Sequence, residues 1–188
     1  MQDSPTYFQY LKNRSQAGLI YRKFWLYPRL NGCLIGKTLD IGCGIGDFLS
    51  YRDDIVGVDI NIKMVEWCRS QGQQVEKMKV DELPFKDGSY DSIIMDNVLE
   101  HIKNPEKILR EAYRVLRSNG VFLLGVPGSY GYTKDSDHKV FYSEERLIQT
   151  LEINGFAKQE IFSMPFNLKL LEKYLSQYCV YGVFLRKD

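Results

Sequence analysis

Leu39-Asp40-Ile41-Gly42-Cys43-Gly44-Ile45-Gly46-Asp47-Phe48-Leu49 is the stretch of this sequence that decides the fold. Its first residues are typical of a buried strand, and the strand runs into glycines with the spacing G-x-G-x-G. Gly42 permits the chain to reverse direction, while Gly44 and Gly46 let a ligand touch the backbone. We expect a helix to follow and to present its amino-terminal N–H groups to the same ligand.

The charges around this glycine turn indicate which ligand it binds. A dinucleotide fingerprint G-x-G-x-x-G needs another small residue where Asp47 stands. The Asp47 carboxylate would repel a pyrophosphate, and Asp40 adds negative charge just before the turn. We therefore expect a ligand with a cationic group, which makes an NAD-dependent oxidoreductase the weaker alternative function.

A further acidic residue ends the second apolar run. Asp59 follows Gly42 by seventeen residues, a spacing that suits a carboxylate accepting hydrogen bonds from a ribose diol. Beyond it, short apolar runs alternate with segments of helical period, which is typical of βαβ units and a parallel sheet. We expect an α/β fold with seven strands, near residues 38–42, 55–60, 73–78, 90–95, 121–126, 157–163 and 178–186.

Length and composition are those of one globular domain. The chain has 188 residues and a formal net charge of +1, which excludes a polyanion binder driven by overall charge. Four cysteines without C-x-x-C spacing indicate reduced thiols, and the first residues do not resemble a secretion signal. We expect a cytoplasmic protein with no nucleic-acid partner and no stable membrane insertion.

Although the net charge of the whole chain is near zero, its N-terminal segment is basic and rich in aromatic residues. Residues 1–37 hold six basic side chains and one acidic one, whereas residues 38–100 hold six basic and thirteen acidic ones. We expect a single domain, 1–188, in which 1–37 form a helical lid or cap and 38–188 the catalytic core. The basic side chains of this cap are expected to hold an anionic or amphiphilic ligand: Arg14, Arg22, Lys23 and Arg29. The alternatives are an amphipathic helix packed on the domain with its charges in water, and a membrane-surface contact.

Several motifs, taken in order, resemble those of class I S-adenosylmethionine-dependent methyltransferases. The resemblance covers about residues 34–165 and lies closest to the small-molecule branch that includes ubiquinone-pathway O-methyltransferases. The matching segments are Leu39–Leu49, Val56–Ile60, Leu83-Pro84-Phe85 with residues 87–91, Asn97–His101, and the helix ending at residues 114–120. The resemblance implies a Rossmann-like, doubly wound, seven-stranded sheet, mostly parallel with an antiparallel last strand, and helices on both faces.

The resemblance also implies a set of cofactor contacts. The backbone at Gly42 and Gly44, with Asp40 nearby, would hold the methionine end of S-adenosylmethionine, and Asp59 would take the ribose. The family usually has an Asp for the adenine amino group at the position of Lys79, so a shifted Asp81 is the substitute. The complete predicted cofactor site is Asp40, Gly42, Gly44, Asp59, Ile60, Val80, Asp81 and Asn97.

Three residues are candidates for removing a proton from the methyl acceptor. His101 and Asp96 follow the fourth strand, and His138 lies in the polar loop after the fifth. The alternative roles are structural: a packed histidine, a loop-ordering histidine, and a helix cap or a contact to the cofactor amine for Asp96. We predict no metal site, because Asn97-x-x-Glu100-His101 with a distant His138 offers a hard cation few oxygen ligands.

Together these features predict an S-adenosylmethionine-dependent methyltransferase for a small-molecule acceptor, at oxygen rather than carbon or nitrogen. The alternative from a different class is a cofactor-binding protein that has lost catalysis and serves as a partner or regulator.

Overall fold

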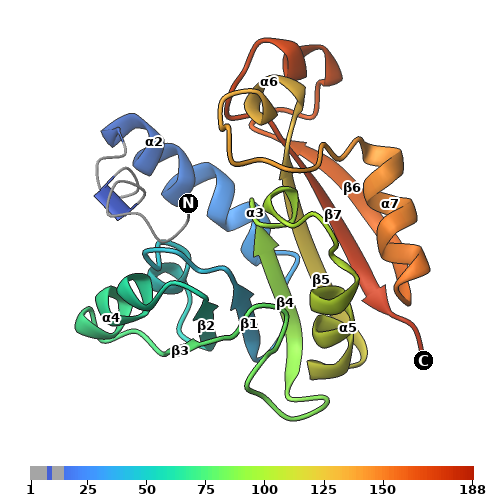
Figure 1. Ribbon diagram of the computed structural model, residues 1–188. Helices are drawn as coiled ribbons and strands as arrows, with labels where there is room; N and C mark the ends of the chain where they lie inside the picture. The colour runs from blue at the N-terminus through green and yellow to red at the C-terminus, as the bar shows by residue number, and fades with distance from the viewer. Residues whose placement is uncertain (1–7, 10–14) are drawn as a thin grey trace.

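Seven strands form one mixed sheet in the order β3-β2-β1-β4-β5-β7-β6 (Figure 1). The computed structural model describes residues 8–9 and 15–188. The strands are β1 (Thr38–Ile41), β2 (Ile55–Asp59), β3 (Val75–Lys77), β4 (Tyr90–Asp96), β5 (Leu116–Pro127), β6 (Phe156–Met164) and β7 (Cys179–Arg186).

The pairing of the strands confirms the predicted Rossmann-like sheet. The neighbours from β3 to β5 pair in parallel. The last strand, β7, runs antiparallel to both β5 and β6. The strand order reverses between β1 and β4, and such a reversal leaves a crevice at the carboxyl ends of these strands.

Helices cover both faces of the sheet (Figure 1). The α-helices are α2 (Gln16–Tyr21), α3 (Tyr27–Asn31), α4 (Ile62–Ser70), α5 (Glu106–Val115), α6 (Ser129–Tyr132) and α7 (Glu144–Ile153). Short helical turns of other types are η1 (Arg22–Leu26), η2 (Leu49–Tyr51), η3 (Leu99–His101) and η4 (Lys169–Lys173). No helix within residues 8–9 and 15–188 is long and apolar enough to cross a membrane.

The central strands are buried on both sides because successive side chains point to opposite faces. In β4, Ile93 and Met95 join a core that contains residues of α5 and α7. The intervening Ile94 joins a second core with residues of α3 and α4. Double burial therefore explains why β4 and β5 read as nearly continuous apolar runs.

The prediction of a helix directly after the glycine turn is wrong. Only the three-residue 3₁₀ turn η2 lies between the glycines and β2. Arg52 is extended and donates hydrogen bonds to Asn31 Oδ1 and Gly36 O, both at 2.7 Å, so it ties the segment's end beside β1. The short connection leaves no room for a longer helix, and the backbone of the turn itself must offer the N–H groups.

Within the predicted cap, residues 16–31 form one helical run over α2, η1 and α3. Its middle, η1, is a π-helical segment, a local widening of the helix that is frequent at functional sites. Leu26, Tyr27 and Leu30 are buried against the sheet, and the Tyr27 ring lies 5.2 Å from that of Phe48. Packing of its second half therefore fixes how the run sits on the sheet.

Alanine variants at two glycines distinguish the effect of backbone strain on stability from the effect of steric crowding. Gly42 and Gly72 both have φ +78°, but a Cβ on Gly42 would lie 2.5 Å from Val98 Cγ2, whereas a Cβ on Gly72 would meet nothing within 4 Å. We expect Gly72→Ala to lower the free energy of unfolding by about 1 kcal/mol. Gly42→Ala should lose about 1–3 kcal/mol more in urea unfolding. Equal losses for the two variants would contradict the crowding at Gly42.

Candidate functional site

A cavity of about 1060 Å³ lies where the strand order reverses. Its walls come from four places: the carboxyl ends of the central strands with the glycine turn, the helical run 16–31, the loops after β4 and α6, and residues 176–181 at the beginning of β7. A smaller cavity of about 190 Å³ lies near residues 141–144 and holds none of the predicted site residues. The large cavity is therefore the candidate site.

Seven predicted residues line this cavity: Asp40, Gly42, Gly44, Asp96, Asn97, His101 and His138. The remaining four are not part of its wall: Asp59, Ile60, Val80 and Asp81. Asp59 is buried behind the turn, whereas Ile60 and Val80 are exposed. Asp81 has a left-handed backbone and is half-buried. The structure thus groups the predicted methionine-end and catalytic residues, and leaves the predicted adenine end apart.

Three aspartates meet at this edge of the sheet. Asp40 lies on β1 between its neighbours β2 and β4, which end in Asp59 and Asp96. Burial raises the pKa of Asp40 well above its usual value, and the nearby Asp96 and Asp59 carboxylates raise it further. A cation placed in the cavity would relieve this repulsion. The electrostatics therefore favour a positively charged ligand, as the sequence predicted.

Asp59 holds the glycine turn in place. Its Oδ2 accepts a hydrogen bond from Gly44 N at 3.0 Å, and its Oδ1 accepts one from Asn61 N at 2.8 Å. Asp59 thus shapes the glycine turn from behind it and lies outside the wall of the cavity.

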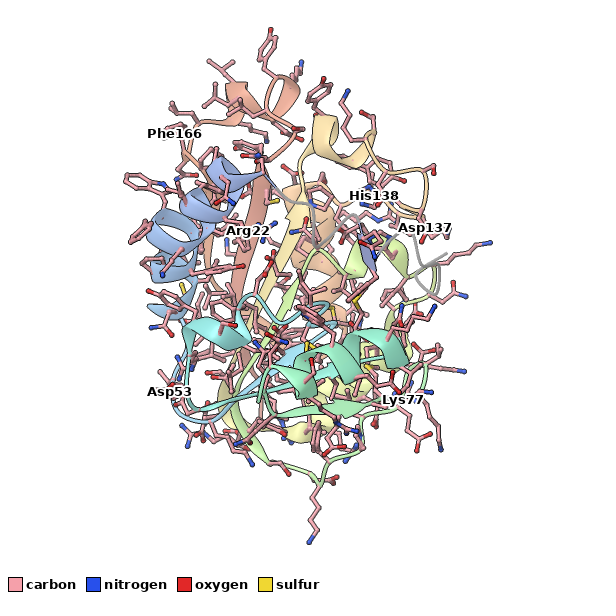
Figure 2. The ribbon with its side chains drawn as sticks, turned by 90° about the vertical axis from the view of Figure 1, so that its left-hand side faces the viewer. Arg22, Asp53, Lys77, Asp137, His138 and Phe166 are labelled. Carbon is pink, nitrogen blue, oxygen red and sulfur yellow. The ribbon has the colours of Figure 1, made fainter. Side chains whose placement is uncertain are left out.

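Asp96 belongs to a polar network on the cavity wall. Its Oδ1 accepts hydrogen bonds from Tyr181 Oη at 3.0 Å and from Asn97 Nδ2 at 2.9 Å. Arg22 Nη1 lies 4.0 Å from its Oδ2. Arg22 reaches Asp96 from the π-helical turn η1, and Figure 2 shows it facing inward from that run.

Among the basic residues predicted to bind an anion, Arg22 lines the cavity. Arg29 instead forms an ion pair with Glu160. Lys23 lies over the exposed ring of Phe24. Arg14 lies outside the described residues. The structure therefore leaves Arg22 as the described member of this set that can contact a ligand in the cavity.

Glu100, His101 and His138 come together at the opposite side of the cavity. Glu100 and His101 belong to η3, and His138 lies in the loop after α6, where Figure 2 shows it beside Asp137. The two imidazole centroids are 4.7 Å apart, and His138 Nε2 lies 3.8 Å from Glu100 Oε1. Burial raises the pKa of Glu100 to about 8. Burial, and then the neighbouring His138, lowers the pKa of His101.

Two residues of this cavity wall, Glu100 and Tyr181, are not among the predicted site residues. Glu100 was considered only in the metal question, although its place next to His101 was a usable signal. Tyr181 was not singled out, because no sequence spacing connects it with Asp96. Only the pairing of β7 with β5, and of β5 with β4, brings these two side chains together.

Comparison with known proteins identifies the domain. Residues 39–124 match the family model described as "Methyltransferase domain". An uncharacterised protein of Methanocaldococcus jannaschii is 30% identical over 129 residues, which cover 66% of this chain and 63% of that protein. A probable S-adenosylmethionine-dependent methyltransferase of Mycolicibacterium smegmatis is 28% identical over 166 residues, which cover 78% of this chain and 65% of that protein. The chain therefore spans somewhat less than two thirds of these two relatives.

Solved structures share the fold. A crystal structure from Thermotoga maritima, described as a SAM-dependent methyltransferase and possible histamine N-methyltransferase, superposes with a TM-score of 0.74 at 23% identity. The alignment covers 97% of this chain and 98% of that one. Residues 39–124 therefore match a methyltransferase domain, and the whole chain has the fold of S-adenosylmethionine-dependent methyltransferases of known structure.

The raised pKa of Asp40 has a consequence for stability. The folded state keeps a proton on Asp40 at pH values where the unfolded chain, with a carboxyl pKa of about 3.9, has lost it. This carboxyl therefore makes the folded state less stable as pH rises above that value. We expect Asp40→Asn to gain stability relative to wild type between pH 5 and pH 8, as pH-dependent urea unfolding would show. The control Asp53→Asn, at an exposed residue, should show the same pH dependence of the free energy of unfolding as wild type. If Asp40→Asn also shows the wild-type pH dependence, the prediction is wrong.

Proposed function

We propose that this protein transfers a methyl group from S-adenosylmethionine to an oxygen of a small acceptor that carries a negative charge. The observation that supports the proposal is a single cavity with three kinds of wall: buried carboxylates at the glycine turn, Arg22 on the helical run, and two imidazoles opposite. Four free cysteines agree with a place in the cytoplasm.

The residues around the glycine turn fit the cofactor. S-adenosylmethionine carries an ammonium and a sulfonium group, and Asp40 is a buried carboxylate on the cavity wall. Asp40 and the backbone at Gly42 and Gly44 would hold the methionine end, and Asp59 would bind the ribose. When bound, the cofactor supplies an electrophilic methyl group on a positively charged sulfur.

The protein's own part is to align the acceptor and to manage its proton. Arg22 would bind an anionic group of the acceptor, because guanidinium groups form strong charge-assisted hydrogen bonds with carboxylates and phosphates. The helical run would thus act as the wall of the acceptor pocket, as the sequence predicts for residues 1–37.

We assign Asp96 a positioning role instead of that of the base. Its Oδ1 already accepts hydrogen bonds from Tyr181 and Asn97, and Arg22 lies beside its Oδ2. With both oxygens engaged in this way, Asp96 is left to hold its neighbours in place. The acceptor hydroxyl would instead be activated by the cluster of Glu100, His101 and His138 on the cavity wall.

Cofactor binding is tested by calorimetry with S-adenosylmethionine and with its demethylated product. We expect both to bind to the wild-type protein in a 1:1 ratio. Asp59→Asn should weaken both by about 10- to 100-fold, because a hydrogen bond to a charged group contributes about 1.5–3 kcal/mol. The matched control is Asp53→Asn, because Asp53 is exposed and Figure 2 shows it apart from the cavity residues Arg22 and His138. Absence of heat for either ligand with folded protein would contradict the proposal.

Acceptor specificity is tested by turnover on a panel of neutral and anionic hydroxyl compounds at saturating cofactor. We expect Arg22→Gln to lower kcat/KM for carboxylate- or phosphate-bearing acceptors by about 10- to 100-fold, with little change for neutral ones. Lys23→Gln, the neighbouring exposed residue, should leave both groups unchanged. An equal loss for neutral and anionic acceptors would overturn the role of Arg22. Cofactor binding without turnover on any acceptor would favour the non-catalytic alternative.

A further inference from the structure

The cluster of Glu100, His101 and His138 has the composition and convergence of a metal centre. Each of the three side chains offers one ligand atom, and these atoms lie within 4.8 Å of one another. They come from two separate segments, η3 and the loop after α6, and all three line the cavity. We propose that they bind a divalent first-row transition-metal cation such as Zn²⁺.

The two imidazole rings are oriented as metal ligands usually are. His138 Nδ1 lies 2.7 Å from Tyr132 O, and His101 Nδ1 lies 3.3 Å from Asp137 O. A carbonyl oxygen can only accept, so in the neutral ring each Nδ1 carries the proton and each Nε2 has the lone pair that a metal ion needs. Metal-bound histidines in proteins typically donate their other N–H in this way, which fixes the tautomer and the ring.

The burial of the Glu100 carboxylate is a second, independent observation that points to a bound cation. Its side chain is 1% exposed, and neither carboxylate oxygen has a hydrogen-bond partner among the described residues. A buried carboxylate without a donor is costly, and a bound cation would satisfy it. The backbone carbonyl of Glu100 accepts from Lys139 N at 2.7 Å and from Val140 N at 3.0 Å, so the position of the residue is held firmly beside the His138 loop.

The spacing of the atoms suits a shared ion better than a direct hydrogen bond. His138 Nε2 and Glu100 Oε1 are 3.8 Å apart, too far for a hydrogen bond. Metal–ligand bonds of about 2.0–2.2 Å separate two ligand atoms of one ion by about 3–4 Å. Asp135 Oδ2 lies 4.0 Å from His138 Nε2, so this half-exposed carboxylate is placed to become a further ligand.

The donor set selects the kind of cation. Two imidazole nitrogens and one carboxylate suit Zn²⁺, Fe²⁺ or Mn²⁺, whereas Mg²⁺ and Ca²⁺ prefer oxygen ligands alone. The sequence-based prediction of no metal considered a hard cation, for which Asn97, Glu100, His101 and His138 offer few oxygen ligands. In the structure the Asn97 amide donates to Asp96 and accepts from Cys179 Sγ, so the proposed ligands are Glu100, His101 and His138.

A role for this ion in the reaction rests on the proposed function. Three protein ligands leave coordination positions open toward the cavity. A hydroxyl of the acceptor bound at such a position would have a lowered pKa, so its proton could leave to water without a histidine acting as the base. Glu100, His101 and His138 would then be ligands, and the acceptor class narrows to compounds with a hydroxyl that can reach the ion.

The metal site can be tested without cofactor or acceptor. Wild-type protein is treated with a chelator, desalted and titrated with Zn²⁺ in a calorimeter, and ¹⁵N-edited imidazole spectra are recorded before and after. We expect one ion per chain with a dissociation constant at or below the micromolar range. The spectra should show Nε2 of both histidines shifted while Nδ1 keeps its proton.

Two variants and one control distinguish this site from adventitious binding. Glu100→Gln keeps the shape of the side chain, and we expect it and His138→Gln to weaken Zn²⁺ binding at least 100-fold. Glu66→Gln, an exposed carboxylate on α4, should bind as wild type does. Urea unfolding of each variant shows that it is folded. The metal proposal is overturned if folded Glu100→Gln binds Zn²⁺ as tightly as wild type does, or if wild type binds no Zn²⁺. Neither result affects the separate tests of cofactor binding and turnover.

Discussion

Repulsion among three neighbouring carboxylates is the constraint that shapes the candidate site. Asp40, Asp59 and Asp96 belong to three neighbouring parallel strands whose carboxyl ends share one edge of the sheet. Asp40 and Asp59 are buried and Asp96 is partly buried, and burial together with the two neighbouring carboxylates raises the pKa of Asp40. The protein meets the constraint locally: Asp59 accepts a hydrogen bond from Gly44 N in the glycine turn, and Asp96 accepts one from Tyr181 with Arg22 nearby. Asp40 is left facing a cavity that suits a cation.

The same arrangement divides the cavity into two functional sides. The glycine turn and its carboxylates make one side suitable for the positively charged cofactor of the family. The helical run 16–31 contributes Arg22 through a π-helical turn, so the charge of that wall depends on local helix geometry. Opposite it, the cluster of Glu100, His101 and His138 concentrates nitrogen and oxygen ligands where an acceptor would lie. Binding and activation of the acceptor are therefore proposed on walls from different parts of the chain.

Much of the fold could be predicted because it depends on local patterns. The apolar run that ends at Gly42 and the alternation of strands with helical segments predicted a parallel α/β sheet, and the glycines predicted the turn. The helix expected after the turn failed for a tertiary reason. Hydrogen bonds from Arg52 to Asn31 and Gly36 tie that segment's end beside β1, so only the 3₁₀ turn η2 forms.

The fold class, the resemblance to methyltransferases and the position of the glycine turn could be predicted from the sequence, because these depend on residues close together in the chain. Only the tertiary structure decided which distant side chains meet. Tyr181 reaches Asp96 through the pairing of β7, β5 and β4, and His138 reaches Glu100 because the loop after α6 hydrogen-bonds to the Glu100 backbone. No local spacing encodes these encounters, since they follow from strand order and loop packing over the whole domain.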